Sequence, residues 1–392
     1  MHIVFSVSCD QSHRLLLATV LQDTAMRVGQ KGPITQIIAG CSEEEEKKIL
    51  AEPTFYYDYR VHFTPSYVPH PLPEIDDDYS PYNKPFSLRH FLRNANPPVQ
   101  HETIALVDGD IALFKPLEVN TGRNITKYYK GSRDPVTVTD EVRDGVAMAQ
   151  DWTAYMGAGW FGDDSAEVIC ADKPCANVSS DEAREFYAGT GPPYIMTRHD
   201  AMAFIDDYCD FVVEGRKLLS NDWMTEMYAY AAAAANHGIK YTILTNLGVT
   251  HPTMGDGTEY WTFLDDKESY KYTANPCEDP FEVSLPNDPP VGVHYCQHYL
   301  LNEEGRYFYK YALPLSVVDC DAEVLAVPPA SEYDLIGVIY AAAGAEERSK
   351  KRHEVWAECS LTKSVNRALL RLKQATCPAM SFNSFQGLEL VR

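Results

Sequence analysis

The chain has 392 residues, 45% of them hydrophobic, so it is long enough and apolar enough to bury a sizeable core in one or two domains. Its 56 acidic against 34 basic residues give a formal net charge of −22, which argues against a nucleic-acid-binding surface and against docking on anionic lipid. The composition therefore predicts a soluble protein with an acidic surface and no nucleic-acid partner.

Strands and helices alternate through the first hundred residues. Apolar, β-branched runs bounded by turn residues predict strands, and apolar residues that recur on one face predict helices. The elements predicted in this part are strands over 2–8, 34–39 and 60–63, helices over 11–27 and 83–94, and a short acidic helix opened by a capping box of Ser42 and Glu45. This alternation predicts an α/β fold with a mostly parallel central sheet flanked by helices.

Two long segments interrupt this alternation. Residues 64–82 are rich in proline, tyrosine and aspartate, and the aspartate run 76–78 is interpreted as a solvated acidic turn rather than a metal cluster. Residues 120–190 are polar and rich in glycine, and we expect them to form a long loop insertion of the kind that often covers a binding site. Trp152 and Trp160 within it are candidates for stacking on a sugar or a peptide, with simple packing as the alternative.

The periodic pattern returns near residue 199. The elements predicted from there on are helices over 199–219 and 222–237, strands over 240–244 and 291–295, and a basic helix over 345–373. Because no stretch of the chain has the composition of a linker, we expect residues 1–320 to form the main domain. Residues 321–392 are expected to form a C-terminal extension, with its helix, packed on that domain.

The strongest chemical signal lies at 104–116. An apolar run ends at Val107 and is followed by Asp108, Gly109 and Asp110, after which a second apolar run begins. Carboxylates that follow a strand in an α/β sheet lie at the edge where ligands bind. An Asp-X-Asp step suits a hard divalent cation that also contacts substrate phosphates. The alternative is a strand that ends in a plain Asp-Gly turn.

Three further segments carry side chains suited to ligand binding. Asp222 and Glu226 would share one face of a predicted helix, where like charges repel unless a ligand compensates, or they simply mark a helix start. His294 lies at the end of a late strand and is followed by the amide of Gln297. His294 is a potential metal ligand, or it is a structural histidine. Lys84, at a predicted helix start, would hold a phosphate or a sugar hydroxyl, unless this segment merely caps the helix.

Cysteines and glycosylation sequons favour a secretory-pathway lumen. The ten cysteines include no Cys-X-X-Cys pair, which disfavours a zinc ribbon or a thioredoxin motif, and Cys170 and Cys175 are close enough for a local disulfide. Asn124 and Asn177 each begin an N-glycosylation sequon. No signal peptide or membrane-spanning run is visible, so the targeting segment of a lumenal protein would have been removed from this sequence or was never there.

In their order along the chain, these segments resemble those of the plant and algal peptidyl serine α-galactosyltransferases and the related hydroxyproline O-arabinosyltransferases. The likeness covers roughly residues 2–310. Its elements are the opening strand 2–9, the stretch 29–35, His70-Pro71-Leu72, Tyr82-Asn83-Lys84-Pro85, Leu106-Val107-Asp108-Gly109-Asp110 where the galactosyl enzymes have Leu-Asp-Ala-Asp-Met, residues 223–230 where the family has Trp-Ile-Ser-Glu-Met-Tyr-Gly-Tyr, and His294-Tyr295.

The chain also departs from this family. Gly189-Thr190-Gly191-Pro192-Pro193 stands where the family has Gly-Gly or Gly-Asn-Ser-Pro, and Cys296 stands where it has glycine. Residues 130–188 and the tail do not match. Because the loops that differ are those expected to meet the acceptor, the departures bear on the sugar and the acceptor rather than on the metal-binding motif.

The resemblance implies a GT-A-like α/β fold and a metal-dependent, retaining transfer of a sugar, galactose above all, from a UDP-sugar to a serine or hydroxyproline hydroxyl of a protein. It also implies Golgi or ER lumen as the location, and a native protein anchored through a segment absent here. Mn²⁺ or another divalent cation would be held by Asp110 and His294, with Asp108 on the cation or on the ribose. The other implied roles are nucleotide-sugar binding by Ser6, Val7, Ser8, Lys84, Gly191 and Gln297, and orientation of the sugar or charge stabilisation at its anomeric carbon by Asp222 or Glu226.

Three alternatives stay open. The chain could be a hydroxyproline O-arabinosyltransferase, which would transfer a pentose. It could be a non-catalytic sugar- or peptide-binding protein on the same scaffold, although a dead site has no need to keep Asp108, Asp110 and His294 together. It could also be a metal-dependent phosphoesterase or nucleotidyltransferase, which would release a nucleoside monophosphate where a glycosyltransferase releases the diphosphate.

Overall fold

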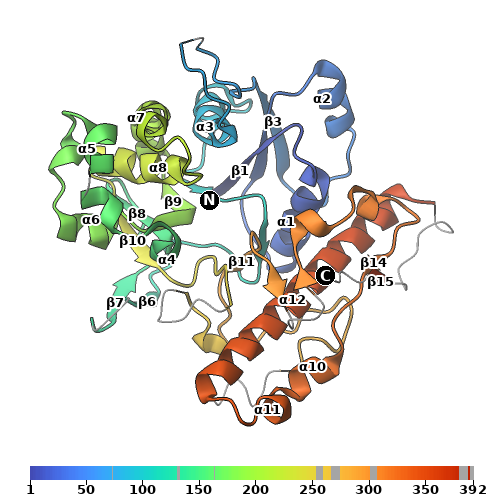
Figure 1. Cartoon of the computed structure of the whole chain (residues 1–392). Coiled ribbons are helices and arrows are strands. Elements are labelled where there is room, and N and C mark those ends of the chain that lie inside the picture. The colour runs from blue at the N-terminus through green and yellow to red at the C-terminus, as the bar shows by residue number, and fades with distance from the viewer. Residues whose placement is uncertain are drawn as a thin grey trace.

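The computed structural model describes residues 1–72, 74–129, 133–162, 164–252, 259–265, 274–300 and 307–378, together with a short strand at 387–388 (Figure 1). The strands are β1 (His2–Ser8), β2 (Ile34–Ala39), β3 (Tyr59–Thr64), β4 (Thr103–Leu106), β5 (Ile111–Leu113), β6 (Asn124–Lys127), β7 (Val136–Thr139), β8 (Val146–Asp151), β9 (Thr190–Thr197), β10 (Lys240–Leu244), β11 (Gly292–His294), β12 (Tyr299–Leu300), β13 (Tyr307–Phe308), β14 (Val324–Leu325) and β15 (Gly387–Leu388). The α-helices are α1 (Arg14–Arg27), α2 (Glu43–Leu50), α3 (Asn83–Asn94), α4 (Thr153–Met156), α5 (Asp164–Cys170), α6 (Ser180–Phe186), α7 (Arg198–Leu218), α8 (Thr225–Asn236), α10 (Ala330–Asp334), α11 (Ile336–Ile339) and α12 (Ala345–Thr376).

A central sheet organises the fold. Seven of the described strands form it, in the order β10-β8-β9-β4-β1-β2-β3. Neighbouring strands run parallel except at β9, which is antiparallel to both β8 and β4. The predicted α/β class, with a mostly parallel sheet flanked by helices, is therefore confirmed.

Helices cover both faces of this sheet because successive strand residues point to opposite sides. Val4 of β1 and Leu106 of β4 belong to a core cluster that also contains buried residues of α3, α7 and α8. Ile3 and Phe5 belong to a different cluster, shared with α1. Strands buried on both faces read as continuous apolar runs, which is why β1 and β2 were predictable from their composition.

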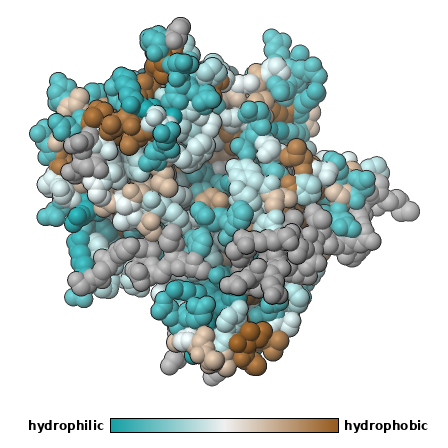
Figure 2. Space-filling view, in the orientation of Figure 1, coloured by the Kyte–Doolittle hydropathy of each residue, from teal (hydrophilic) through white to brown (hydrophobic). Residues whose placement is uncertain are grey.

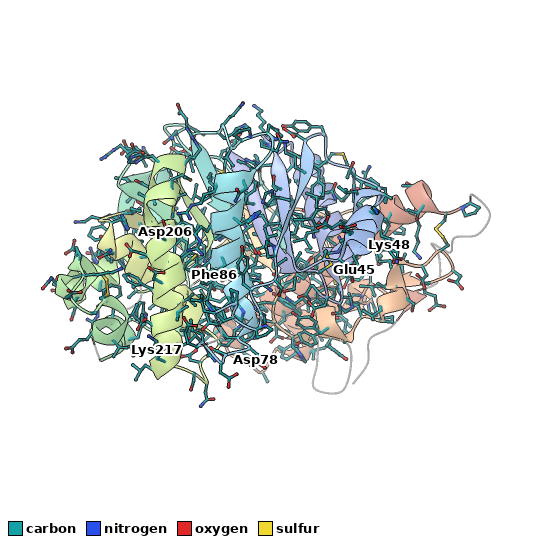
Figure 3. The ribbon with its side chains drawn as sticks, turned by 90° about the horizontal axis from the view of Figure 1, so that it is seen from above. Glu45, Lys48, Asp78, Phe86, Asp206 and Lys217 are labelled. Atoms are coloured by element: carbon teal, nitrogen blue, oxygen red, sulfur yellow. A yellow bond between two sulfur atoms is a disulfide. The ribbon has the colours of Figure 1, made fainter. Side chains whose placement is uncertain are left out.

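Figure 3 shows α3, which carries Phe86, side by side with α7, which carries Asp206 and Lys217. Ion pairs from Arg89 and Arg93 of α3 to Asp206 of α7 join the two helices. Helix α2, with Glu45 and Lys48, lies apart from them in the same view. The layer formed by α3 and α7 places the start of α3 close to the carboxyl end of β1.

The early elements match the sequence prediction closely. Strands 2–8 and 34–39 and the helix 83–94 have the predicted bounds, and the capping box forms, since Ser42 Oγ accepts from Glu45 N and Glu45 Oε2 accepts from Ser42 N. The first helix begins at Arg14 rather than at residue 11, because backbone turns occupy the intervening residues.

The acidic loop departs in part from the prediction of a solvated turn. Asp76 and Asp78 are exposed, as expected. Asp77 is instead half-buried: it accepts a hydrogen bond from Tyr82 Oη at 3.0 Å and pairs with Arg216 of α7 at 2.8 Å. The middle carboxylate of the run therefore ties this loop to the helical layer.

The prediction that residues 120–190 form an irregular insertion is wrong. This segment contains β6, β7, α4, α5 and α6, and its strand β8 is part of the central sheet. Strand β9 follows at Thr190, with Pro192 and Pro193 inside it. The sequence concealed both strands, because β8 is poor in β-branched residues and prolines normally argue against a strand interior.

The C-terminal region packs on the sheet side that carries α1. The predicted basic helix is present as α12, whose buried residues run from His353 to Lys373 and which contacts α1 and strands β12 to β14. The fully buried ring of Trp356 contacts Phe114, Trp261 and Phe263, with ring centroids 5.4, 6.2 and 5.0 Å away. This aromatic cluster joins α12 to the segment that follows β5.

All ten cysteines lie within the described residues, and eight of them form disulfides. The predicted Cys170–Cys175 bond is confirmed. The others are Cys9–Cys41, Cys277–Cys359 and Cys320–Cys377. Such disulfides are consistent with a secreted or lumenal protein.

The visible surface is mostly polar. Figure 2 shows a largely hydrophilic face with hydrophobic areas at its upper left and near the position of α11, where Val338 and Ile339 are exposed. The sequon asparagines Asn124 and Asn177 are both exposed. None of the described helices combines the length and the apolarity needed to cross a bilayer.

Candidate metal centre

The aspartate motif lies in the turn between β4 and β5, next to the end of β1. The backbone N of Val107 still bonds to Val4 O at 2.9 Å, so the chain leaves the central sheet only at Asp108. Gly109 suits this path, since a Cβ there would lie 3.1 Å from the Phe5 ring, closer than an ordinary contact. The turn therefore lies against β1 and carries one aspartate on each side of the glycine, with Asp110 nearly buried.

His294 reaches the same turn from β11. This strand pairs antiparallel with β5, with His294 opposite Ile111, and Tyr295 N bonds to Asp110 O at 2.9 Å. The imidazole Nε2 lies 3.1 Å from Asp110 Oδ1 and 3.5 Å from Asp108 Oδ2. The three predicted metal ligands are therefore brought together, with one ligand atom of each within 4.8 Å of the others.

This donor set fits a divalent cation. Two carboxylates and an imidazole are ligands that first-row divalent ions accept, and carboxylate oxygens suit Mn²⁺ and Mg²⁺ in particular. The cluster is mostly buried, so its carboxylates need cationic partners, a role that a lysine ammonium or a bound divalent cation can fill. Asp108, Asp110 and His294 thus form a possible divalent-metal site.

Lys84, in the first turn of α3, lies between two carboxylates. Its Nζ is 3.0 Å from Asp108 Oδ1 and 3.3 Å from Glu226 Oε2. Burial alone would lower the pKa of Lys84, but Asp108 and Glu226 outweigh it and raise this pKa above its ordinary value. The ammonium is therefore charged at neutral pH and joins Glu226 to the candidate metal site.

Lys310 is a second cation of the cluster, and sequence reasoning missed it. It opens a short 3₁₀ helix (Lys310–Ala312), and its Nζ bonds to Asp110 Oδ2. Burial favours the neutral form of Asp110, but the charges of His294 and Lys310 outweigh this and lower the pKa of the Asp110 carboxyl below its ordinary value. No motif marks Lys310, since it is a lone lysine in an aromatic stretch far along the chain.

Of the two carboxylates predicted to act in the chemistry, the structure joins Glu226 to the cluster. Glu226 lies in the first turn of α8, accepts a hydrogen bond from Tyr208 Oη and contacts Lys84. Its backbone N donates to Tyr79 Oη at 3.1 Å. Burial raises the pKa of Glu226, with Lys84 and Tyr208 acting in the opposite direction.

Asp222 is placed differently from its prediction. Helix α8 begins at Thr225, so Asp222 lies in the preceding turn and does not share a helix face with Glu226. Its carboxylate accepts from Met224 N at 2.8 Å and from Tyr228 Oη at 3.2 Å. These bonds stabilise the turn that leads into α8. Asp222 therefore fits the alternative interpretation, in which it marks a helix start.

The residues predicted to border the nucleotide lie at the end of β1, beside the start of α3. Ser6 Oγ donates to Asn83 O at 3.3 Å, and Asn83 Nδ2 donates to Ser8 Oγ at 2.8 Å. Val7 Cγ1 lies 3.5 Å from the position of a Cβ on Gly109. The end of β1, the start of α3 and the aspartate turn thus meet at one edge of the sheet.

Trp152 packs beside the metal ligands. Its ring centroid is 5.4 Å from that of His294, and a Cβ on Gly191 would come within 2.1 Å of the indole, so the glycine lets the ring lie on the β9 backbone. The indole Nε1 is buried without a hydrogen-bond partner. Gln297, predicted near the nucleotide, contacts Cys296 Sγ at 3.7 Å.

Trp160 fits the packing alternative. Its indole Nε1 donates to Ala188 O at 3.0 Å, and its ring lies 4.7 Å from that of Tyr228. With both its polar atom and its ring satisfied inside the protein, Trp160 is a core residue rather than a stacking platform.

Metal binding should strengthen as the pH rises. Burial alone would lower the pKa of His294, but Asp110 and Asp108 outweigh it and raise this pKa above its ordinary value of 6.5. Protons compete with a cation for the imidazole. We therefore expect Mn²⁺ affinity, measured by calorimetry, to fall as the pH drops through the raised pKa and to level off above it. An affinity unchanged between pH about 5 and 8 would contradict His294 as a ligand.

A second His and Asp cluster occurs on the surface. Asp144, His199 and Asp200 also bring ligand atoms within 4.8 Å of one another. Asp144 Oδ1 accepts from Thr197 Oγ1, and Asp200 Oδ2 accepts from Gly145 N, both at bonding distance. Asp144 and His199 are exposed, and the two carboxylates accept hydrogen bonds that stabilise the start of α7. These structural roles account for the cluster without a bound metal.

No protein-family model matches the chain, and no curated protein matches it. Among solved structures, one that matches is of an active-site mutant of LgtC, at 13% identity and a TM-score of 0.38, covering 76% of this chain and 88% of that chain. At that level of similarity, the description of the fold rests on the strand order and pairing given above.

Proposed function

We propose that the protein is a metal-dependent, retaining glycosyltransferase of GT-A-like architecture, which moves a sugar from a UDP-sugar to a hydroxyl group of a protein. The observation that carries this proposal is the meeting of Asp108, Asp110 and His294 within 4.8 Å at the edge of the sheet. Ligands bind at the carboxyl ends of strands in such sheets. The order of motifs that resembles the peptidyl galactosyl and arabinosyl transferases supports the same function.

In this proposal, Asp110 and His294 hold the cation, and Asp108 contacts the cation or the ribose. The cation, for which Mn²⁺ is the favoured candidate, would act as a Lewis acid and stabilise the charge that develops on the departing diphosphate. Ser6, Val7 and Ser8 border the nucleotide at the end of β1. This edge also carries the start of α3, where the Lys84 ammonium lies 3.0 Å from Asp108 Oδ1.

The remaining polar residues act on the sugar. Lys84 fixes the carboxylates of Asp108 and Glu226 with respect to each other. Glu226 is then placed to orient the sugar or to stabilise positive charge at its anomeric carbon. Gly191 admits the Trp152 ring beside His294. In this proposal, Gly191 and Gln297 contribute to binding of the nucleotide sugar.

Glu226 and Asp222 can be separated by mutation. We expect Glu226→Gln to lower kcat by about 10²-fold or more, because the charge facing the sugar is lost. Asp222→Asn should have a much smaller effect, because its contacts are to Met224 N and Tyr228 Oη. Steady-state kinetics of both variants test this assignment, and a larger loss in Asp222→Asn would reverse it.

The resemblance favours galactose as the sugar and serine or hydroxyproline as the acceptor, in the lumen of the Golgi or ER. The test is transfer by the purified chain, with Mn²⁺, from a panel of UDP-sugars to serine- and hydroxyproline-containing peptides, read by mass spectrometry. A hexose on serine supports the galactosyltransferase. A pentose on hydroxyproline indicates the arabinosyl branch instead.

A non-catalytic binding protein on the same scaffold is the second candidate, because Lys310 bonds to a carboxylate that the cation needs. In that case the chain would bind neither Mn²⁺ nor UDP and would transfer no sugar from any donor. Binding of UDP that depends on Mn²⁺ would exclude this candidate even where the acceptor panel yields no product.

A further inference from the structure

Lys310 contacts the carboxylate that the proposed cation requires. Its side chain is 9% exposed, and its Nζ bonds to Asp110 Oδ2, while Asp110 Oδ1 faces His294 Nε2 at 3.1 Å. Both oxygens of Asp110 are therefore engaged by protein groups. A cation that enters between Asp110 and His294 must compete with the ammonium group for the same carboxylate.

Lys310 is held in this position by the surrounding fold. The strand before it, β13, pairs with β12, and Phe308 of β13 lies in the core cluster that contains Trp356. Just after it, Leu313 O accepts a hydrogen bond from His13 Nε2 at 2.9 Å. The Nζ is also 4.8 Å from the centroid of the Tyr311 ring. The lysine is thus presented by anchored backbone on both sides, rather than by a mobile surface segment.

We propose that Lys310 is a built-in counter-ion, which a divalent cation displaces from Asp110 and which then pairs with an anionic group of the ligand that binds the cation. This proposal rests on the proposed function and concerns the regulation of that same site. The exchange conserves charge balance, because the dication neutralises Asp110 and the nucleoside diphosphate supplies the new partner of the ammonium.

The physical reason is the cost of an unpaired buried charge. Among the described residues, Asp110 is the carboxylate that bonds to the Lys310 ammonium. If a cation takes over Asp110 alone, the buried ammonium loses its partner, which is strongly unfavourable. If a diphosphate binds together with the cation, it replaces Asp110 as the partner of the ammonium. Cation and diphosphate should therefore bind with positive coupling, and each should raise the affinity of the other by the same factor.

The test is calorimetry on the full chain and on Lys310→Met, with Mn²⁺ alone and with Mn²⁺ in the presence of UDP. In the wild type, we expect Mn²⁺ alone to bind weakly and UDP to strengthen its binding by about tenfold to a hundredfold. In Lys310→Met the competitor is gone, so Mn²⁺ alone should bind about tenfold more tightly, and the strengthening by UDP should shrink by a similar factor.

Two further variants make this test specific. Lys127→Met removes a comparably buried lysine that pairs with Glu185 at 2.8 Å, outside the cluster, and should leave both affinities unchanged. Lys310→Gln keeps a hydrogen-bond donor without the charge, and we expect it to change Mn²⁺ affinity and the effect of UDP as Lys310→Met does. It replaces Lys310→Met if that variant does not fold.

The outcomes separate this proposal from the proposed function. If wild type and both Lys310 variants bind Mn²⁺ equally and with equal coupling to UDP, the counter-ion exchange is overturned while the metal centre stands. If none of them binds Mn²⁺, with or without UDP, the metal centre and the proposed function are overturned together with it.

Discussion

Replacing Asp110 or His294 with alanine should abolish metal-dependent sugar transfer. Each residue supplies a ligand atom to the candidate metal site, and His294 Nε2 lies 3.1 Å from Asp110 Oδ1. Loss of either should weaken Mn²⁺ binding and remove charge stabilisation of several kcal/mol, so that the transfer rate falls by about 10³-fold or more. The measurement is the rate of glycopeptide formation at saturating Mn²⁺, together with Mn²⁺ affinity by calorimetry.

A matched control removes an aspartate outside the site. Asp78→Ala takes away an exposed carboxylate from the acidic loop and should leave transfer and metal affinity unchanged. Asp110→Asn keeps the shape of the side chain and an oxygen that accepts from Lys310, so it tests loss of the charge alone, and circular dichroism monitors the fold. Full activity in Asp110→Ala and His294→Ala would contradict the metal assignment.

Trp356→Ala should cause the largest loss of stability among single core substitutions of the C-terminal helix. The indole is fully buried on α12 and packs against the rings of Phe114, Trp261 and Phe263. Truncation of a buried tryptophan typically lowers the free energy of unfolding by about 3–5 kcal/mol, through lost burial and the cavity left behind. Urea unfolding followed by circular dichroism measures it.

Trp223→Ala is the matched control for this prediction. Trp223 is 68% exposed, and its main contact is an edge-on approach to Tyr79 at 6.0 Å. Its removal should change the free energy of unfolding by about 0.5 kcal/mol or less. Equal losses in the two variants would mean that α12 is not anchored through the aromatic cluster around Trp356.

The position of the aspartate motif was predictable, because its surroundings follow simple rules. A buried parallel strand is a continuous apolar run, and the two aspartates interrupt such a run at the carboxyl end of β4. The grouping with His294 was not derivable in the same way, since 184 residues separate it from Asp110. It came from the resemblance of the motif order, and the pairing of β11 with β5 brings the residues together.

Lys310 and the start of α8 show where sequence patterns fail. The contact between Lys310 and Asp110 depends on tertiary packing, for which a single lysine among aromatic residues gives no periodic signal. The entry of α8 was predicted three residues too early, because Asp222 resembles an acidic first turn, whereas it accepts hydrogen bonds in the turn before the helix. Strands β8 and β9 were missed because of their unusual composition, including two prolines in β9.

The central claim, metal-dependent cleavage of a nucleotide sugar, can be measured without knowledge of the acceptor. The purified chain is incubated with UDP-sugars, with Mn²⁺ or with EDTA, and the nucleotide product is separated by chromatography. We expect slow release of UDP with at least one donor, dependent on the metal and lost in Asp110→Ala. Release of UMP, or release of UDP at the same rate in EDTA, would contradict it.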